Sequence, residues 1–308
     1  MRTAFVDVLF EEAQRDPSIA LLTGDLGFGV LERFSEKLPE QFLNCGVAEQ
    51  SMIGVAAGMA ASGYKVFVYS IANFPTLRCL EQIRNDVTYH RLNVTIVSVG
   101  AGFAYGTLGY SHFGLEDLAV MRAIPGMDII CPSDALEVEQ IVRDRLLGIT
   151  QPAYLRLGKA GEPRFHDRKP AFSRGEAICI REGSEATIAA CGSVLGVALE
   201  ARELLADLGH SVAVLSVPYV RPISFDCVEA ALGGGLVTVE EHSSTGGLGS
   251  AVLDAVIARG GVPKMRVIGA PPEIPRQIGT QSYLREMAGI TVEAVVNATR
   301  DLLHEGKV

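Results

Sequence analysis

The 308-residue sequence lacks three features: clusters of basic residues, long apolar runs and closely spaced cysteine pairs. Its 27 Lys and Arg against 36 Asp and Glu give a net charge of -9, which would repel a phosphate backbone, so we expect no binding of nucleic acid. A local pocket can still oppose the overall sign, and small anions remain possible ligands. No apolar stretch approaches the ~20 residues that a membrane-spanning helix needs, so we expect no contact with a membrane.

The six cysteines are scattered, with no C-x-x-C pair, and several lie in apolar runs. This usage is typical of reduced core residues in a cytosolic protein. The N-terminal stretch MRTAFVDVLFEEAQRD has apolar and acidic residues at helical spacing and shows no targeting signal. The sequence therefore predicts a cytoplasmic protein. The cysteines are Cys45, Cys79, Cys131, Cys179, Cys191 and Cys227.

Length and composition indicate an ordinary globular protein with two domains. Hydrophobic residues make up 48% and charged residues 20% of the chain, which argues against disorder and against a fibrous protein. A chain of 308 residues exceeds the usual size of a single core. Residues 158–175 concentrate Gly, Pro and charge without a clear period, which marks a domain boundary. We place the first domain at 1–160, a linker at 161–183 and the second domain at 184–308.

Strands and helices alternate along both domains. Runs rich in β-branched residues fall between amphipathic helices, which indicates parallel sheets covered on both faces. The predicted fold class is therefore α/β, with two doubly wound domains. The expected strands lie at 20–25, 64–70, 93–100, 127–133, 153–157, 185–191, 211–217, 235–241 and 264–270, and the expected helices include 77–90, 115–124, 135–147, 194–208, 223–232, 247–259 and 291–304.

Ligands of open parallel sheets collect beyond the carboxyl ends of the strands. The loops after the strands that end near residues 25, 70 and 100 are therefore where we expect the chemistry. In the second domain, GGLGS at 246–250 fits neither the P-loop nor the full dinucleotide fingerprint, and it predicts only the start of a helix.

The pentapeptide GVAEQ at 46–50 places Glu49 at the start of an otherwise apolar helix. A carboxylate among Val, Ala, Met and Ile is costly to bury unless it is paired, and a buried carboxyl can hold or share a proton near neutrality. Placement in the first turn, next to the positive end of the helix dipole, would explain the same residue without a chemical role. Spacing alone leaves both explanations open.

GVAEQ, the Gly/Ala-rich helix after it and the strand GYKVFVYS resemble the pyrimidine-binding domain of transketolases, which use thiamine diphosphate. The resemblance implies that Glu49 hydrogen-bonds N1′ of the thiamine aminopyrimidine. That contact favours the imino tautomer, whose 4′-nitrogen takes the proton from C2 of the thiazolium. Glu49 is thus an expected catalytic and cofactor-binding residue.

The loop after that strand, residues 70–74, is expected to contact the same ring. In the family an aromatic residue stacks on the aminopyrimidine, and Phe74 matches it, with a core phenylalanine as the alternative. Relatives often carry a companion aromatic three residues earlier, where this sequence has Ile71, also an expected cofactor contact. Asp25 and Leu26, in TGDLG, match positions near the thiazolium, although a turn aspartate would look the same.

The segment from Gly109 to His112 and the following FGLEDLAVMRAIPGMDIICPSDALE resemble the family in order and spacing. His112 matches the histidine that contacts the donor hydroxyls at C1 and C2, although a lone histidine in a Gly-rich loop is more often only solvated. Just before it, relatives have Gly-Glu-Asp-Gly, and here Leu108 replaces the aspartate that reads a sugar hydroxyl. An apolar side chain normally rejects the polar group that such a site once held, so the usual acceptor or hydroxyl stereochemistry is in doubt.

Two arginines align with residues that hold the sugar phosphate in transketolases. These are Arg2 and Arg156, the latter in AYLRLGKAG, and bidentate guanidinium contacts suit a phosphate. A surface salt bridge would explain Arg2 equally simply, and it would explain Arg156 less well. The family's phosphate histidine falls on Gly100, so the phosphate pocket is incomplete.

The resemblance covers nearly the whole chain but includes no counterpart of the family's diphosphate-binding domain. That domain carries a Gly-Asp-Gly motif and a later Asn, which bind Mg2+ and the cofactor's diphosphate. No acidic cluster in this sequence offers replacement ligands for a hard cation, so we assign no metal ligand to this chain. The resemblance implies an N-terminal transketolase subunit that brings Mg2+, the diphosphate site and assisting histidines. Two copies of each chain would form a heterotetramer in which this chain also pairs with its own copy.

The reaction implied is transfer of a two-carbon ketol unit from a ketose or ketose phosphate to an acceptor. Glu49 would tune the cofactor, His112 would orient the donor and Arg156 would hold a phosphate. Three alternatives stay open: the β subunit of a 2-oxo acid dehydrogenase E1, a chemistry like that of 1-deoxyxylulose-5-phosphate synthase, and a non-catalytic regulatory subunit that kept the fold. The residues around His112 favour transketolase, and Glu49, Phe74 and His112 together argue against a non-catalytic role.

Overall fold

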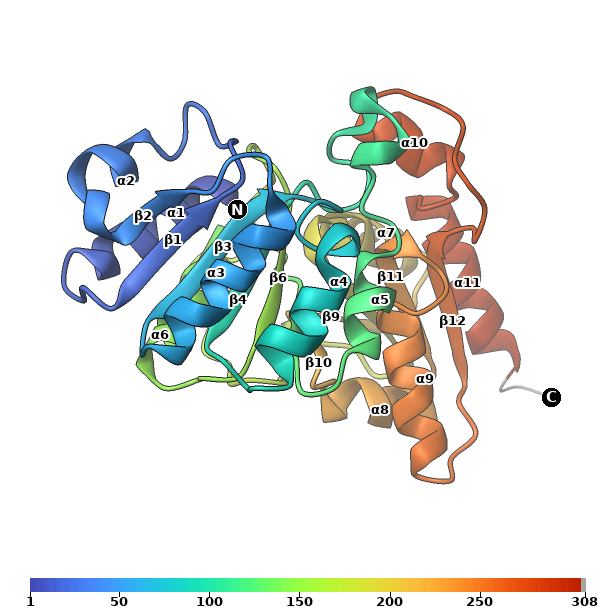
Figure 1. Ribbon diagram of the computed structural model, residues 1–308. Coiled ribbons are helices and arrows are strands. Elements are labelled where there is room, and N and C mark those ends of the chain that lie inside the picture. Colours follow the sequence, from blue (N-terminus) through green and yellow to red (C-terminus); the bar gives the residue numbers. More distant parts are fainter. Residues whose placement is uncertain (306–308) are drawn as a thin grey trace.

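The computed structural model describes residues 1–305, which form two α/β units (Figure 1). The first unit comprises α1 (Arg2–Ala13), β1 (Ile19–Thr23), α2 (Glu32–Lys37), β2 (Phe42–Asn44), α3 (Glu49–Ala61), β3 (Lys65–Ile71), α4 (Leu80–Gln82), β4 (Val94–Val99), α5 (Asp117–Ala123), β5 (Asp128–Ile130), α6 (Ala135–Leu147) and β6 (Ala153–Leu157). The second comprises β7 (Ile178–Arg181), β8 (Ala186–Cys191), α7 (Leu195–Asp207), β9 (Val212–Ser216), β10 (Tyr219–Arg221), α8 (Phe225–Leu232), β11 (Leu236–Ser243), α9 (Leu248–Ala258), β12 (Met265–Ala270), α10 (Gln281–Met287) and α11 (Val292–Glu305).

The first sheet has the strand order β10-β5-β6-β4-β3-β1-β2. Its neighbouring strands run parallel, apart from β10, which is antiparallel to β5. The central strands β3, β4 and β6 are buried along almost their whole length, because helices cover both faces. Helices α1 and α6 pack together on one face, and α3 covers the other (Figure 1). This arrangement confirms the doubly wound prediction for the first unit.

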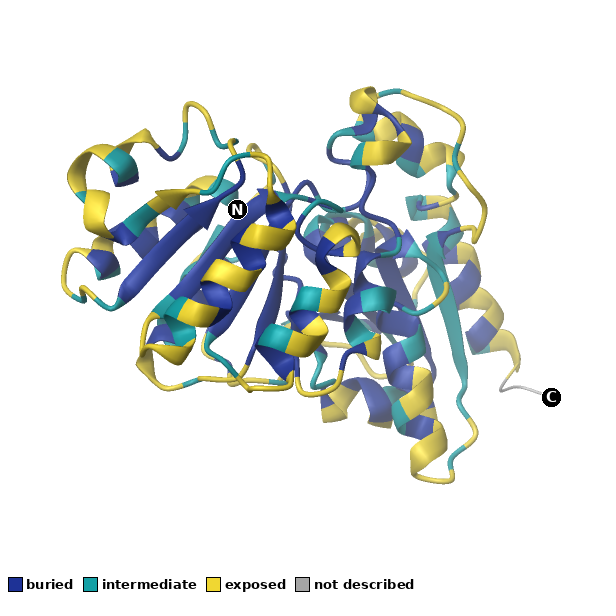
Figure 2. Ribbon diagram, in the orientation of Figure 1, coloured by how far each residue is buried: buried dark blue, intermediate teal, exposed yellow. Residues whose placement is uncertain are grey.

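The second sheet has the order β12-β11-β8-β9-β7, with β7 antiparallel to β9. Helices α7 and α11 cover one face, and α8 and α9 lie on the other face, toward the first unit. Leu118 and Met121 of α5 share one apolar core with Leu248 and Val252 of α9, so the two units pack directly against each other. Figure 2 shows the result: the central strands are dark blue in the interior, the edge strand β12 is mostly teal, and exposed residues lie on the outer helix faces and loops.

Most predicted elements are confirmed to within about two residues, and α6 and β6 coincide with the expected ranges. The predicted helix start at GGLGS is also confirmed, since α9 begins at Leu248. There the carboxylate of Glu240 accepts hydrogen bonds from the backbone N–H groups of Leu248 and Gly249 at 2.7 and 2.9 Å. A protein carboxylate therefore already uses the donors that a phosphate loop would offer.

Four elements were not expected from the sequence: α2, β7, β10 and α10. Strand β10 has only three residues and leaves the second unit to pair with β5, Tyr219 lying opposite Ile130. Strand β7 falls within residues 161–183, which we predicted as a linker, and pairs with β9. Cys179 on β7 is exposed, so the prediction of a core position was wrong for this cysteine, while Cys79, Cys131, Cys191 and Cys227 are buried.

A buried ion pair joins the two units. Arg156 of β6 donates to Oδ2 of Asp117 at 2.7 Å and to the carbonyl of Gly114 at 2.6 Å, all within the first unit. The same guanidinium donates to the carbonyl oxygen of Glu241, on β11 of the second unit, at 2.9 Å. Both side chains of the pair are at most 2% exposed. The guanidinium of Arg156 therefore links an aspartate of the first unit to a backbone carbonyl of the second.

Candidate functional site

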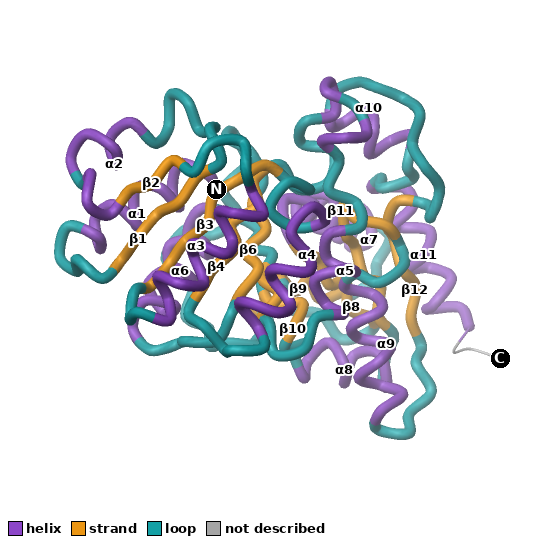
Figure 3. Tube along the Cα trace, in the orientation of Figure 1, coloured by secondary structure: helices purple, strands orange, loops and turns teal. Residues whose placement is uncertain are grey.

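The loops at the carboxyl edge of the first sheet bring the predicted site residues to one side of the molecule. Strands β1, β2, β3 and β4 are parallel, so their carboxyl ends lie along one edge, at the upper side of Figure 3. Asp25 follows β1, Glu49 follows β2, Phe74 follows β3, and His112 lies in the loop after β4. Residues that are far apart in the sequence therefore share one edge.

Glu49 begins α3 and is only 3% exposed. Its Oε2 accepts a hydrogen bond at 2.8 Å from Nη1 of Arg78, whose side chain is 46% exposed. The carboxylate is therefore buried but balanced by a cation that reaches in from solvent. Sequence reasoning missed Arg78, and the only available signal was its position four residues after Phe74, in the same loop.

A chain of contacts runs outward from Glu49, first to Arg78, then to Phe74 and finally to His112. The guanidinium carbon of Arg78 lies 4.5 Å from the centroid of the Phe74 ring. The rings of Phe74 and His112 lie 5.3 Å apart between centroids, edge to face, at 68°. Phe74 is only half-buried and belongs to none of the apolar core clusters among residues 1–305, so it is available to stack on a ligand.

The loop that carries His112 is closed by backbone contacts. Gly102 and Gly114 form an antiparallel bridge at its base, and Nδ2 of Asn73 donates to the carbonyl of Phe113 at 2.5 Å. Two 3-10 turns, η4 (Gly106–Leu108) and η5 (Tyr110–His112), lie within it. Oδ1 of Asn73 is fully buried and has no hydrogen-bond partner among residues 1–305.

Asp25 lies in a turn held by a residue that we did not predict. Asn44 accepts a hydrogen bond from the backbone N–H of Asp25 at 2.9 Å and donates from Nδ2 to Oδ1 of Asp25 at 3.0 Å. The same Asn44 oxygen accepts from the backbone N–H of Gly46 at 3.0 Å, which fixes the chain just before Glu49. Asp25 has φ +56°, a conformation that aspartate and asparagine tolerate better than most residues. Leu26, which follows it, and Ile71, at the end of β3, are half-buried.

Arg156 does not face the site as expected. Its side chain is 2% exposed, and the guanidinium donates to Asp117, Gly114 and Glu241, while Nη1 has only the sulfur of Cys131 at 3.9 Å. The strand at 153–157 that carries Arg156 was predicted correctly, but the burial of its side chain could not be read from the motif. In this structure Arg156 holds the two units together and is not placed to bind a substrate phosphate.

Arg2, Gly100 and Leu108 are distributed around the same edge. Arg2 is half-buried on α1, and its Nε is fully buried, with no hydrogen-bond partner among residues 1–305. Gly100 has φ +96°, and a Cβ there would lie 2.3 Å from the ring of Tyr105, so a histidine could not be accommodated without moving that ring. Leu108 is 54% exposed on η4, where its side chain can meet a ligand.

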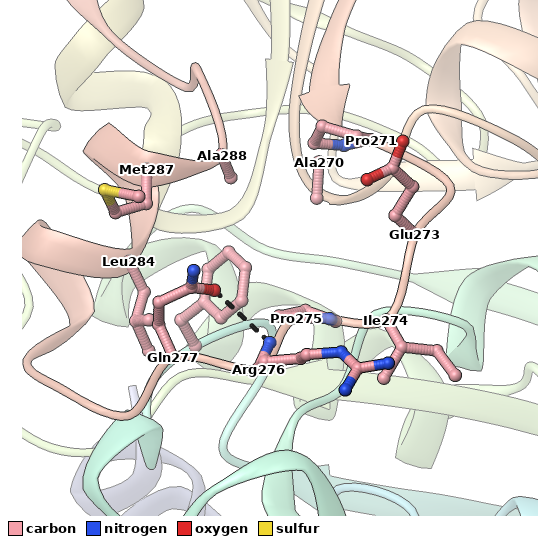
Figure 4. A pocket seen from close by; sticks show the side chains of 11 residues that line it. Ala270, Pro271, Glu273, Ile274, Pro275, Arg276, Gln277, Leu284, Met287 and Ala288 are labelled. Carbon is pink, nitrogen blue, oxygen red and sulfur yellow. Dashed lines mark hydrogen bonds between the residues drawn. The ribbon is translucent and has the colours of Figure 1, made fainter.

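A separate cavity of about 330 Å3 lies behind the His112 loop, between Phe103, residues 270–277 and α10. Figure 4 shows Leu284 and Met287 lining it from α10, with Arg276 and Glu273 on the opposite loop. None of Glu49, Phe74 or His112 lines this cavity. It is therefore distinct from the candidate site.

Thiol chemistry and metal binding by this chain alone find no support near Glu49. Burial, together with the charge of Glu49, raises the pKa of the Cys79 thiol to about 12, which keeps it protonated at neutral pH.

Among residues 1–305, no group of three or more His, Cys, Asp and Glu side chains could hold a metal ion. Within the same range, no helix has the length and apolar character needed to span a membrane.

The geometry fits an aminopyrimidine ring. A buried carboxylate, Glu49, and a half-buried phenyl face, Phe74, are linked through Arg78, and they match a ring that carries an N–H donor and a flat π surface. Glu49 and Phe74 could therefore hold such a ring at the carboxyl edge.

Two family models match the chain. The transketolase pyrimidine-binding domain matches residues 1–161, and the transketolase C-terminal domain matches residues 175–295. Together they cover most of the sequence and both α/β units.

Several known proteins are similar over almost the same length. An apulose-4-phosphate transketolase subunit of Phocaeicola vulgatus is 38% identical over 276 residues, which is 88% of each chain. The 6-deoxy-6-sulfo-D-fructose transketolase subunit SqwH of a Clostridium strain is 35% identical, over 98% of this chain and 94% of that one. A solved structure described as a split gene transketolase, inactive beta4 tetramer, superposes with a TM-score of 0.88 at 35% identity, over 98% of this chain and 97% of the other.

Longer relatives align with this chain over only part of their length. The 1-deoxy-D-xylulose-5-phosphate synthase of Syntrophotalea carbinolica is 32% identical over 98% of this chain, which corresponds to 48% of that protein. The remaining half of such a relative has no counterpart in this sequence.

Proposed function

The chain belongs to the transketolase family, and from that premise we propose that it is the short subunit of a two-chain transketolase, which transfers a two-carbon ketol unit with thiamine diphosphate. The observation that carries the proposal is the run of contacts from the buried Glu49 through Arg78 to Phe74 and His112. Three of these four residues are the ones that the family resemblance assigns to cofactor and donor.

Each residue has a separate task in this proposal. Glu49 accepts a hydrogen bond from N1′ of the aminopyrimidine and holds the proton at that atom, while Phe74 stacks on the ring. Ile71, Asp25 and Leu26 line the ring and the thiazolium. Thiamine diphosphate, when bound, supplies the carbanion chemistry that no amino-acid side chain can provide.

His112 lies directly beyond Phe74 and is therefore placed to donate to the hydroxyls of a ketose donor. Arg2, half-buried at the start of α1, is the candidate for a phosphate on the substrate. Leu108 replaces a polar contact with an apolar one, so we propose an acceptor other than the usual phosphorylated aldose. The relatives named for apulose 4-phosphate and for 6-deoxy-6-sulfo-D-fructose support a specialised sugar substrate. Equal efficiency with ribose 5-phosphate and xylulose 5-phosphate would contradict this.

A second, longer subunit completes the site in this proposal and brings Mg2+ and the diphosphate contacts. Relatives of the same length are named as subunits, which supports a partner. The outer side of α3 is exposed and small, with Ser51, Gly54, Val55 and Gly58 on successive turns, so a partner backbone can approach closely. We propose two copies of each chain in a cytoplasmic heterotetramer.

A chemistry like that of 1-deoxyxylulose-5-phosphate synthase is the second candidate, because proteins of that name are 32% identical to this chain. The two reactions differ in the donor. Release of CO2 from pyruvate by the assembled enzyme would favour the synthase, and ketol transfer from a ketose without CO2 release would favour transketolase.

Calorimetric titration tests the proposal. Thiamine diphosphate with Mg2+ is titrated into this chain alone and into its mixture with the cognate long subunit. We expect binding only in the mixture and its loss in Glu49→Ala. Binding by this chain alone would mean that it holds a diphosphate site of its own, and no binding in either sample would favour a non-catalytic role.

A further inference from the structure

Arg78 is the one member of the contact chain that the proposed function leaves without a task. It lies in a 3-10 turn, η2 (Leu77–Cys79), at the carboxyl edge. Its Nη1 donates to Glu49 at 2.8 Å, and its guanidinium carbon lies 4.5 Å from the centroid of the Phe74 ring. No other hydrogen bond of its guanidinium is seen among residues 1–305.

These two partners are the ones that we propose for the aminopyrimidine. A guanidinium is flat, donates hydrogen bonds to a carboxylate and stacks on an aromatic face. The cofactor ring is also flat, and in our proposal it donates from N1′ to Glu49 and stacks on Phe74. The side chain of Arg78 and the ring therefore make the same kind of contact with the same two residues.

We propose that Arg78 competes with the cofactor ring for Glu49 and Phe74 and so sets the cofactor affinity of the assembled enzyme. This inference rests on the proposed function, because the partners of the ring are those assigned there. Release of Arg78 keeps Glu49 compensated, since the N1′ donor takes over the hydrogen bond that Nη1 gives up.

The surroundings of Arg78 allow it to leave. Its side chain is 46% exposed, whereas the Glu49 side chain that it contacts is 3% exposed. Leu77 and Leu80, on either side, are exposed as well, so the departure of Arg78 opens no cavity in the core.

Removal of the competitor is expected to tighten cofactor binding. A half-exposed ion pair and an exposed cation–π contact are each weak, so we expect Arg78→Ala to lower the Kd of thiamine diphosphate about 3- to 10-fold. Arg78→Lys keeps the charge but loses the flat stacking group, and its Kd should fall by less.

The experiment is calorimetric titration of thiamine diphosphate, with Mg2+, into the complex of this chain with its long subunit. Wild type, Arg78→Ala and Arg78→Lys are compared with Arg84→Ala, which removes the same charge from an exposed position that bonds only its neighbour Asn85. A tighter Kd in Arg78→Ala and an unchanged Kd in Arg84→Ala would support competition.

An unchanged or weaker Kd in Arg78→Ala, with binding intact in wild type, would overturn the inference and leave the proposed function standing. If Arg78→Ala does not fold, as judged by circular dichroism, Arg78→Lys provides the test. A lower Kd than in wild type would then support competition, and an unchanged or higher Kd would overturn it. Failure of the wild-type complex to bind the cofactor at all would instead overturn the proposed function, and this inference with it.

Discussion

Glu49 and Asp117 are both buried carboxylates paired with an arginine, but the two pairs lie in different settings. The partner of Asp117, Arg156, is 2% exposed, whereas the partner of Glu49, Arg78, is 46% exposed. Asp117 also accepts a hydrogen bond from Tyr154 at 2.5 Å. At the junction of the units, both members of the ion pair are buried within the protein. At the carboxyl edge, only the carboxylate is buried, and the arginine that neutralises it can turn to solvent. In the function that we propose, this difference separates a charge that stabilises the fold, Asp117, from a charge that binds the cofactor, Glu49.

The electrostatics of the junction follow from this closure. Burial alone would raise the pKa of Asp117, but the charge of Arg156 and the hydrogen bonds from Arg156 and Tyr154 hold it below its ordinary value. Asp117 is therefore ionised throughout the neutral range. Removing its charge would leave Arg156 buried without a partner, which is the costly half of a broken buried pair.

The largest expected effect on stability is therefore at the junction. Asp117→Asn should lower the free energy of unfolding by about 3–5 kcal/mol, because the guanidinium of Arg156 stays buried and uncompensated. Chemical denaturation monitored by circular dichroism measures this. The matched control is Asp254→Asn, which breaks the pair with Arg122 at a side chain that is 72% exposed, and which should cost less than about 1 kcal/mol. Equal losses in the two variants would show that burial does not distinguish these pairs.

The buried Glu240 should make the free energy of unfolding depend on pH, with a smaller effect than that of Asp117→Asn. Burial raises its pKa to about 7, although the backbone N–H groups of Gly249 and Leu248 oppose the shift. Its ordinary pKa is 4.5, so between about pH 4.5 and 7 the folded state holds a proton that the unfolded state has lost. The contribution of Glu240 is full below pH 4.5 and is lost as pH rises toward 7, by up to about 3 kcal/mol.

The comparison of wild type with Glu240→Gln isolates that contribution. Relative to wild type, the variant should gain stability as pH rises from 4.5 to 7, measured as the difference in free energy of unfolding at each pH. His242 works in the opposite direction, because burial lowers its pKa to about 4 and stability is lost as pH falls below 6.5. A difference between variant and wild type that stays constant over this range would contradict the raised pKa of Glu240.

At the carboxyl edge, we expect substitution of the buried carboxylate to affect stability little and activity strongly. Glu49→Gln is expected to change the free energy of unfolding by less than about 1 kcal/mol, because Arg78 can turn to solvent once the charge is gone. Cofactor-dependent turnover of the two-chain enzyme should fall by about 10²- to 10⁴-fold, the usual cost of losing a proton-handling group. Denaturation and steady-state assays on the same preparation measure both quantities. A variant that is strongly destabilised, or fully active, would remove the contrast with Asp117.

The sequence indicated which residues share the carboxyl edge of the sheet, but it did not indicate the contacts at the junction of the units. Loops that follow parallel strands converge by topology alone, so Glu49, Phe74 and His112 could be grouped from their order along the chain. Arg156 was misjudged, because a motif gives the position of a residue but not whether its side chain turns inward. Arg78 and Asn44 were missed, since their roles depend on hydrogen bonds between loops distant in sequence. Strand β10 was missed because three residues carry no period.

Substitution of Leu108 should have the smallest effect on stability, and it tests a single proposed contact with the sugar. Its side chain is 54% exposed on η4, so Leu108→Asp removes little packing and should change the free energy of unfolding by no more than about 0.5 kcal/mol. If this side chain meets the sugar, an aspartate restores a hydrogen-bond acceptor for a hydroxyl. The ratio of kcat/KM for ribose 5-phosphate to that for the preferred acceptor should then rise roughly 10-fold. Leu108→Asn separates hydrogen bonding from charge, and it should produce part of the same shift. An unchanged ratio in both variants would place the selection of acceptor elsewhere, because an exposed side chain at the mouth of the site would then have no contact with the sugar.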